Sequence, residues 1–208
     1  MGTGEEMEKV QGFYRSRFER FGHDARSLDM SLPSQQLRFR VLSGVGDLRG
    51  TSVLDVGCGF GDYFEYLEKE HISTQYTGLD ISPEFVKEGA SRHPGAKFYQ
   101  TDIGNFHAEG GFDYVMASGT FNVRFREDQE AWTLKTLEKM FSLCRKGMAV
   151  SLISTWADSS HHRDDIFYFS PERTFEFCKS LTRWVVLRHE YMPHDFTIYL
   201  YKENQEVA

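Results

Sequence analysis

The stretch Val53-Leu54-Asp55-Val56-Gly57-Cys58-Gly59-Phe60-Gly61-Asp62 decides the fold that we expect for this chain. A short apolar, β-branched strand runs here directly into three glycines at alternate positions. Glycines let the chain turn sharply and let a ligand approach the backbone at the carboxyl end of the strand. Dinucleotide-binding turns place their third glycine one residue later. The carboxylate of Asp55 would also repel a pyrophosphate, whereas it suits a ligand that carries an ammonium group.

Strands alternate with helices downstream of this turn. Apolar segments predict strands at residues 52–56, 75–80, 97–100, 112–117 and 148–154. Helices are expected at 63–69, after Ser82-Pro83-Glu84, from Glu127 to Cys144 with Arg145-Lys146-Gly147 as its C-terminal end, and after Ser170-Pro171-Glu172. This alternation predicts a doubly wound α/β fold with a mostly parallel sheet. The last two strands, 183–189 and 196–201, are joined too closely for a crossover, so we expect them to pair antiparallel.

The first part of the chain is expected to be helical. The spacing of Phe13, Tyr14, Phe18 and Phe21 predicts one helix ending at Gly22. A second helix is predicted around residues 37–42, ending near Gly44 or Gly46. We therefore expect residues 1–48 to form an N-terminal helical cap and residues 49–208 to form one compact Rossmann-like domain.

Composition limits the classes of protein to consider. The 208 residues carry a formal net charge of −7, which argues against nucleic acid as the main partner because such binding depends on phosphate neutralisation. No stretch reaches the ~18 apolar residues of a membrane span, and residues 1–10 lack the apolar part of a secretory signal. The three cysteines have no paired spacing, so we expect a cytoplasmic protein without a metal site. Aromatic residues reach 15%, either in an aromatic-rich core or around a flat or apolar ligand.

Two further aspartates follow predicted strands. Asp80, followed by Ile81, ends the second strand, where a carboxylate can accept both hydroxyls of a ribose. A helix-capping or loop role is the alternative for Asp80. Asp102 follows the third strand and can accept a hydrogen bond from an adenine amino group while Ile103 packs on the ring. Taken alone, an aspartate after a strand is also a common turn residue.

These motifs, with Phe112-Asp113-Tyr114-Val115 after them, resemble the ordered motifs of the class I S-adenosylmethionine-dependent methyltransferases. The resemblance covers residues 50–201 and implies a seven-stranded sheet whose last strand is antiparallel. It also implies S-adenosylmethionine as the cofactor. By resemblance, the cofactor-binding residues are Asp55, Gly57, Cys58, Gly59 and Gly61 at the methionine portion, Asp80 with Ile81 at the ribose, Asp102 with Ile103 at the adenine, and Ala117, Ser118 and Gly119 beneath the sulfonium.

The acceptor is expected to be a small molecule. Relatives that methylate nucleic-acid bases or glutamine amides often carry an Asn/Asp-Pro-Pro-aromatic motif after the fourth strand, and residues 117–122 lack it. The chain is therefore similar to the small-molecule branch of the family. That similarity implies direct displacement onto O, N or C of an aromatic or natural-product-like acceptor, with no nucleic acid and no membrane as partner. The oligomeric state stays open.

Catalytic groups follow less directly from the motifs, because methyl transfer from a sulfonium needs alignment of the reactants and a base only for some acceptors. We expect residues 155–169 to form a lid over the substrate, in which His161 or His162 acts as general base. A solvated polar loop, or a metal site with Asp165, is the alternative for these histidines. Tyr14 and Arg38 of the N-terminal helices are expected to contact the cofactor carboxylate or the substrate.

Two other functions stay open on the sequence. The first is a nicotinamide-dependent oxidoreductase with an irregular glycine turn, although Asp55 and the glycine spacing argue against it. The second is a non-catalytic cofactor-binding protein on the same fold, because direct displacement requires no particular catalytic residue.

Overall fold

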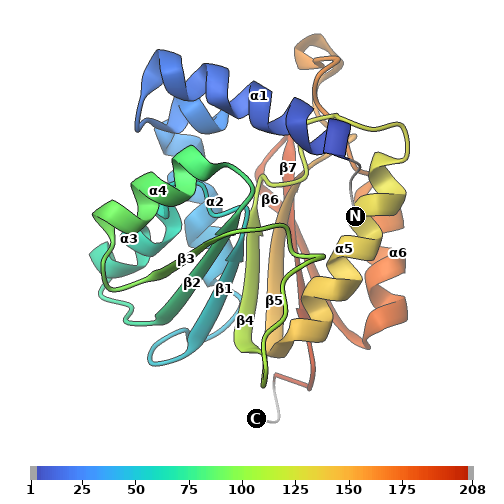
Figure 1. The fold of residues 1–208 in the computed structure, drawn as a ribbon. Coiled ribbons are helices and arrows are strands. Elements are labelled where there is room, and N and C mark those ends of the chain that lie inside the picture. Colours follow the sequence, from blue (N-terminus) through green and yellow to red (C-terminus); the bar gives the residue numbers. More distant parts are fainter. Residues whose placement is uncertain (1–3, 206–208) are drawn as a thin grey trace.

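Seven apolar segments form one sheet in the computed structural model, which describes residues 4–205. The strands are β1 (Ser52–Val56), β2 (Gln75–Asp80), β3 (Lys97–Gln100), β4 (Phe112–Ser118), β5 (Cys144–Ile153), β6 (Trp184–Met192) and β7 (Asp195–Tyr201). Their order across the sheet is β3-β2-β1-β4-β5-β7-β6. β1 is parallel to β2 and β4, whereas β7 is antiparallel to β5 and β6. The doubly wound fold with a C-terminal antiparallel pair is therefore confirmed (Figure 1).

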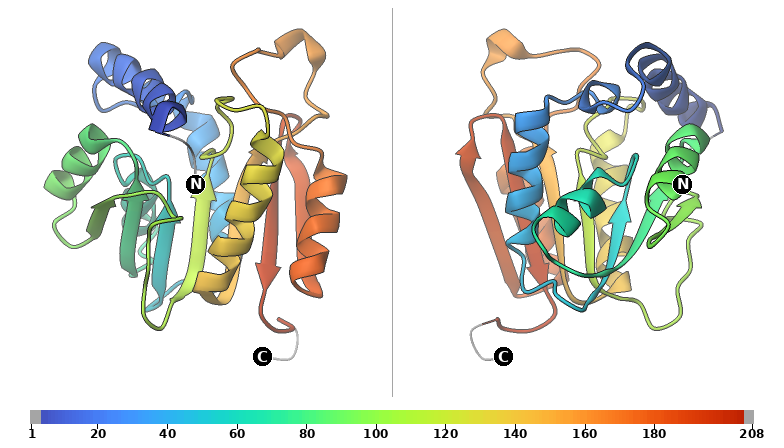
Figure 2. Two further views of the ribbon diagram at one scale, coloured as in Figure 1. Left: turned by 45° about the vertical axis from the view of Figure 1, so that its right-hand side comes forward. Right: turned by 90° about the vertical axis from the view of Figure 1, so that its left-hand side faces the viewer.

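Helices cover both faces of this sheet (Figure 2). The helices are α1 (Gly4–Phe21), which does not lie on a face of the sheet, α2 (Leu32–Ser43), α3 (Asp62–Lys69), α4 (Pro83–Arg92), α5 (Gln129–Leu143) and α6 (Pro171–Leu181), with 3-10 turns η1 (Ala25–Leu28) and η2 (Ser159–His161). Alternation along β1 places Val53 in the core beneath α2 and α3, and Leu54 in the core beneath α5 and α6. Because both faces are covered, a ligand site is expected at the carboxyl edge of the sheet.

α1 lies across that carboxyl edge and not against a face of the sheet (Figure 1). Gln11 Nε2 donates a hydrogen bond to the backbone oxygen of Ile81 at 2.7 Å, and Arg15 pairs with Glu84 at 2.9 Å. The lid loop (residues 155–169) rises from the same edge, and a bridge between Ser154 and Phe169 closes its base. The connection from β3 to β4, residues 101–111, contains no helix. Loop residues therefore lie beside α5 at this position.

α5 ends earlier than the sequence predicts. The segment 145–147 is predicted to close the helix, but the helix ends at Leu143 and β5 begins at Cys144. Gly147 lies against β7 instead, where a Cβ atom would make tight contacts of 3.1 Å with the backbone oxygen of Leu200 and with Tyr201 Cδ1. The glycine thus permits the close approach of two strands.

Within residues 4–205, the helices are all too short or too polar to cross a membrane. The three cysteines, Cys58, Cys144 and Cys178, are free and buried. Burial raises the pKa of each thiol, so the reactive thiolate form is disfavoured at all three positions.

Candidate active site

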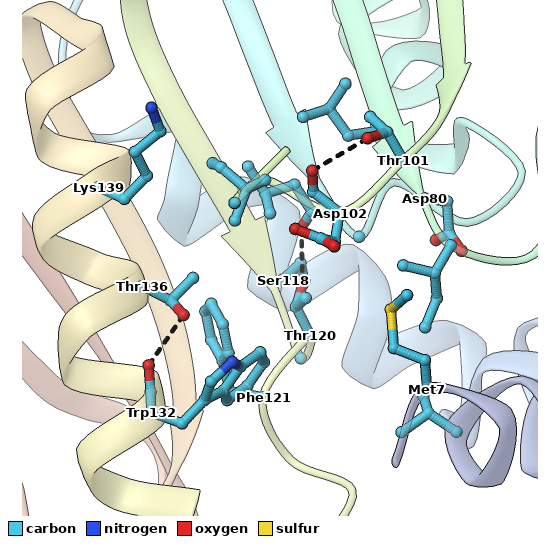
Figure 3. Close-up of a pocket in the computed structure, with 18 of the residues that line it drawn as sticks. Met7, Asp80, Thr101, Asp102, Ser118, Thr120, Phe121, Trp132, Thr136 and Lys139 are labelled. Carbon is cyan, nitrogen blue, oxygen red and sulfur yellow. Dashed lines mark hydrogen bonds between the residues drawn. The ribbon is translucent and has the colours of Figure 1, made fainter. Parts of the chain in front are cut away.

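A cavity of about 800 Å³ lies at the carboxyl ends of the central strands, beneath α1. Figure 3 shows Met7 and Asp80 on one side of it, Trp132, Thr136 and Lys139 of α5 on the other, and Asp102, Ser118 and Phe121 between them. Most of the lining is apolar, with polar groups at the strand ends and polar and charged side chains along α5, among them Lys135, Glu138 and Lys139. This size and composition are typical of a small-molecule site.

The turn after β1 has a backbone shape that favours glycine. Gly57, Gly59 and Gly61 have φ angles of +72°, +54° and +81°, in the left-handed region. The backbone N–H groups of Gly57 and Cys58 both donate to the backbone oxygen of Leu79 in β2, at 2.8 and 3.0 Å. A Cβ atom at Gly57 would lie 2.5 Å from the side chain of Thr120. The glycines therefore bring the turn close both to β2 and to the loop after β4.

Asp80, at the end of β2, is oriented by the backbone. Its Oδ2 accepts a hydrogen bond from the Gly59 N–H at 2.9 Å, and its Oδ1 accepts one from the Ser82 N–H at 2.8 Å. Burial raises the pKa of Asp80 to about 6, although the backbone N–H groups oppose that rise. Each oxygen can accept more than one hydrogen bond. The carboxylate can therefore still receive two hydroxyls from a ligand in the cavity.

Asp55 lies behind the glycine turn, in a small hollow next to the cavity. The hollow has a volume of about 20 Å³ and is lined by Asp55, Asp62, Gln35 and Cys58, among others. Tyr76 Oη donates to Asp55 Oδ2 at 2.6 Å. Burial nevertheless raises the pKa of Asp55 to about 7, and the nearby carboxylates of Asp80 and Asp62 add to the rise. A cation placed here would relieve this repulsion.

Five of the residues expected at the cofactor line the cavity, namely Ile81, Asp102, Ile103, Ser118 and Gly119. The two carboxylate oxygens of Asp102 accept hydrogen bonds from the backbone N–H and the side-chain amide of Asn105, at 3.1 and 2.7 Å. Ser118 Oγ is buried and has no hydrogen-bond partner among the described residues. A buried polar atom without a partner is costly, so a bound molecule is a natural partner for it.

Four expected cofactor residues lie outside the lining of both spaces, namely Gly59, Gly61, Ala117 and Arg38. Gly59 is covered by Leu28, and Ala117 is fully buried in the core. Arg38 was expected to contact the cofactor carboxylate or the substrate, but its side chain does not line the cavity. Its Nε donates to Asp195 Oδ2 in β7 at 2.6 Å, with both side chains buried. This partner satisfies the charge of Arg38 and turns it away from the cavity.

The lid histidines contribute no group to the lining within the described residues. The backbone of His161 forms part of η2, and its side chain lies outside the described part of the structure. The His162 ring is exposed and stacks on Tyr168, with 4.3 Å between ring centroids. Its Nε2 faces the backbone oxygen of Ala157 at 3.2 Å. The described contacts of His162 are thus made inside the lid loop.

α1 and the turn after it supply the cover of the cavity. Tyr14 lines the cavity as expected, and Met7 and Val10 lie on the same helical face at the preceding turns. Burial and the negative charges of Asp80 and Asp29 raise the pKa of Tyr14, so its hydroxyl stays protonated and can donate. Leu28, Met30 and Trp132 also line the cavity, and the sequence analysis did not single them out as site residues.

The chain is similar to known proteins. Residues 53–147 match a family model described as a methyltransferase domain. A Mycobacterium tuberculosis protein named "Putative methyltransferase Rv1506c" is 34% identical over 155 residues, which cover 73% of this chain and 93% of that protein. The trans-aconitate 2-methyltransferase of Rhodopseudomonas palustris is 33% identical over 69 residues, 33% of this chain and 27% of that enzyme.

Solved structures share the fold. Magnesium protoporphyrin IX methyltransferase from Synechocystis PCC 6803, with bound S-adenosylhomocysteine, has a TM-score of 0.71 at 14% identity, covering 95% of this chain and 100% of that one. The 1,6-didemethyltoxoflavin-N1-methyltransferase of Burkholderia thailandensis has a TM-score of 0.63 at 18% identity, covering 95% and 90%. The glycine turn, the strand order and the similarity to the Mycobacterium tuberculosis protein all indicate the same family. The chain belongs to the class I S-adenosylmethionine-dependent methyltransferases.

Proposed function

We propose that this enzyme transfers the methyl group of S-adenosylmethionine to O, N or C of a small, apolar or aromatic acceptor. The observation that carries the proposal is the continuity of one cavity, which runs from Asp80 and Ser118 to the apolar side chains of α1 and to Trp132. A cofactor held at the strand ends leaves the apolar part to a second molecule. The net charge of −7 argues against a nucleic-acid acceptor.

The residues at the strand ends suit the cofactor. Asp80 can accept the ribose hydroxyls, and Asp102 can accept from the adenine amino group while Ile103 packs on the ring. Asp55, in its hollow, suits the α-ammonium group. Ser118 Oγ offers a buried polar atom without a partner in the described chain, which a bound molecule would satisfy. When bound, S-adenosylmethionine supplies an electrophilic methyl carbon on a positively charged sulfur.

The contribution of the chain to the reaction is to align the acceptor and to exclude water. Met7 and Val10 cover the cavity from α1, while Phe125 and Trp132 border it from the loop after β4 and from α5. The Tyr14 hydroxyl can donate to a polar atom of the acceptor or the cofactor. A base role for His161 or His162 stays a prediction, and it requires the lid loop to move towards the cavity.

The names of similar proteins support a small-molecule acceptor. The two solved structures above are named for magnesium protoporphyrin IX and for 1,6-didemethyltoxoflavin. We also propose the cytoplasm as the compartment, because the three cysteines are free. The division at residue 48 stays a prediction: α1 covers the cavity, whereas α2 packs against β4 and β5.

Calorimetry with S-adenosylhomocysteine tests the cofactor site. Asp80→Asn keeps the size of the side chain but removes its charge, and we expect binding to weaken by about 1–3 kcal/mol. Asp113→Asn is the matched control, because Asp113 accepts from the Ser52 N–H at the opposite edge of the sheet. The control should bind as the wild type does. Absence of binding by the wild type, or unchanged binding by Asp80→Asn, would contradict the assigned site.

Label transfer tests the acceptor class. The enzyme is incubated with methyl-tritiated S-adenosylmethionine and a cell extract, and we expect the label in the small-molecule fraction. Trp132→Ala should reduce this transfer more than it weakens S-adenosylhomocysteine binding. Trp184→Ala, which changes an exposed tryptophan on β6, should leave both unchanged. Label recovered only in nucleic acid or protein would refute a small-molecule acceptor.

A further inference from the structure

The methionine side of the proposed cofactor site is closed in this structure. The hollow beside Asp55 has a volume of about 20 Å³, which is room for about one water molecule. The amino-acid end of S-adenosylmethionine carries both an ammonium and a carboxylate group and is several times larger than a water molecule. The hollow must therefore be enlarged before that end of the cofactor can reach Asp55.

Leu28 and Met30 separate this hollow from the main cavity, and both side chains line both spaces. Leu28 covers Gly59, where a Cβ atom would lie 3.0 Å from Leu28 Cδ2. Met30 covers Gly119 in the same way, with 2.5 Å between such a Cβ atom and Met30 Cε. The two side chains thus occupy the surface over two positive-φ glycines, where the missing Cβ atom lets a ligand approach the backbone.

We propose that residues 25–30 form a gate turn, which moves away to admit the amino-acid end of the cofactor, and that Asp29 couples this movement to the lid loop. The inference rests on the proposed function, from which it takes the position of the amino-acid end beside Asp55. Leu28 and Met30 are adjacent to Asp29 on either side. Movement that displaces the two apolar side chains therefore displaces the carboxylate between them.

The Asp29 carboxylate joins three segments of the chain. Its Oδ1 pairs with Arg17 Nη2 of α1 at 2.8 Å, and its Oδ2 pairs with Arg163 Nη1 of the lid loop at 2.9 Å. Arg163 also pairs with Asp165, at 2.6 Å. Asp29 is the C-terminal cap of η1, with a φ angle of +57° and its backbone N–H donating to the backbone oxygen of Arg26 at 3.1 Å, a left-handed conformation that aspartate adopts more readily than most residues. The cap fixes the direction of the Asp29 side chain between α1 and the lid loop.

These contacts make the position of the gate turn depend on the lid loop. While both ion pairs are intact, Leu28 and Met30 are held over the two glycines. When the lid loop moves and Arg163 leaves Asp29, the ion pair that joins the gate turn to the lid loop is lost, while the contacts of the turn with α1 remain. Asp29 is therefore a positioning residue: it lies outside the lining of the cavity and acts through its two neighbours.

Association kinetics test the gate. Binding of S-adenosylhomocysteine is followed by rapid mixing, with the fluorescence of Trp132 in the cavity wall as the signal. Asp29→Asn should speed association about three- to tenfold, because two partly exposed ion pairs are weakened. Leu28→Ala should also speed association while Asp29 is unchanged. Arg173→Gln, which breaks the α6–α5 pair with Glu130, is the matched control and should not alter the rate.

Hydrogen exchange of the cofactor-free protein tests the coupling to the lid. Arg163→Gln should increase amide exchange in residues 25–30, whereas the Arg173→Gln control should not. Unchanged exchange in this segment would refute the coupling. Association rates that are unchanged or slower in both Asp29→Asn and Leu28→Ala would refute the gate. Failure of the wild type to bind S-adenosylhomocysteine would contradict the proposed function itself, so the two failures are distinguishable.

Discussion

The ionisation of Asp55 predicts that the cofactor binds more tightly as the pH rises. Burial raises the pKa of Asp55 to about 7, and burial raises the pKa of Asp80 to about 6. At each site the carboxylate is the form that serves the ligand, because an ammonium group needs a negative partner and hydroxyls need an acceptor. Protonation of either group therefore competes with binding.

The magnitude follows from the ionised fractions. The apparent Kd equals the intrinsic Kd divided by the fraction of protein in the competent state. With a pKa of about 7, about one-tenth of Asp55 is ionised at about pH 6 and about nine-tenths at about pH 8, so Kd changes roughly tenfold. Asp80, with a pKa of about 6, adds roughly a factor of two over the same range.

Calorimetry with S-adenosylhomocysteine at constant ionic strength measures this effect. Titrations in two buffers of different ionisation enthalpy count the protons exchanged. At about pH 6 we expect about 1.4 protons to be released per ligand, about 0.9 from Asp55 and about 0.5 from Asp80. Asp55→Asn should bind weakly at all pH values and keep only the roughly twofold dependence of Asp80. A wild-type Kd that does not change with pH, or an Asp55→Asn variant that keeps the tenfold change, would refute the reasoning.

The stability of the unliganded protein is expected to change in the opposite direction. Because the folded-state pKa values of Asp55 and Asp80 are raised, the stability linked to them is present below about pH 4 and is lost as the pH rises through about 6 to 7. The urea midpoint should fall over this range, and less so in Asp55→Asn; an equal fall in both would contradict the assignment. Arg38→Met should lower the free energy of unfolding by about 3–5 kcal/mol in urea denaturation, because Asp195 would stay buried without its partner, and a loss below about 1 kcal/mol would show that the pair is unimportant. Cys58 should resist iodoacetamide in the native protein and react after unfolding, because burial raises its pKa; mass spectrometry would detect modification of the native thiol.

Local signals in the sequence were sufficient for most strands and for several residues that line the cavity. The residues of β1, β2 and β3 coincide with the predicted segments, because each is a short segment that contains β-branched, aromatic or leucine residues and is bounded by turn residues. Asp80 ends β2 and Asp102 lies two residues beyond the end of β3, so the parallel pairing of these strands brings both to one edge of the sheet. The helix end at Leu143 was missed because Gly147 contacts β7. A glycine that ends a helix and a glycine that permits a close contact between strands look the same in a sequence.

Residues whose roles depend on distant partners could not be assigned in this way. Arg38 carries a charge near the expected site, but its partner Asp195 is 157 positions away. Leu28 and Met30 are ordinary apolar residues in a short turn, and the gate proposed above rests on their contacts with Gly59 and Gly119, which the sequence does not show. His162 has the right chemistry for a base, yet its described contacts lie within the lid loop. The position of each of these side chains in the fold, more than its residue type, decides whether it contributes to the cavity.

The interior position of β7 has a consequence for the order of folding. β7 follows β6 in the chain but lies between β5 and β6, and all of its residues are buried. Until β7 has been synthesised, β5 presents an unpaired edge and β6 has no neighbouring strand, a state that favours aggregation. Arg38 likewise has no ion-pair partner until Asp195, the first residue of β7, has been synthesised. The sheet can therefore close only late in synthesis, and a chain that stops before residue 195 would expose this edge permanently.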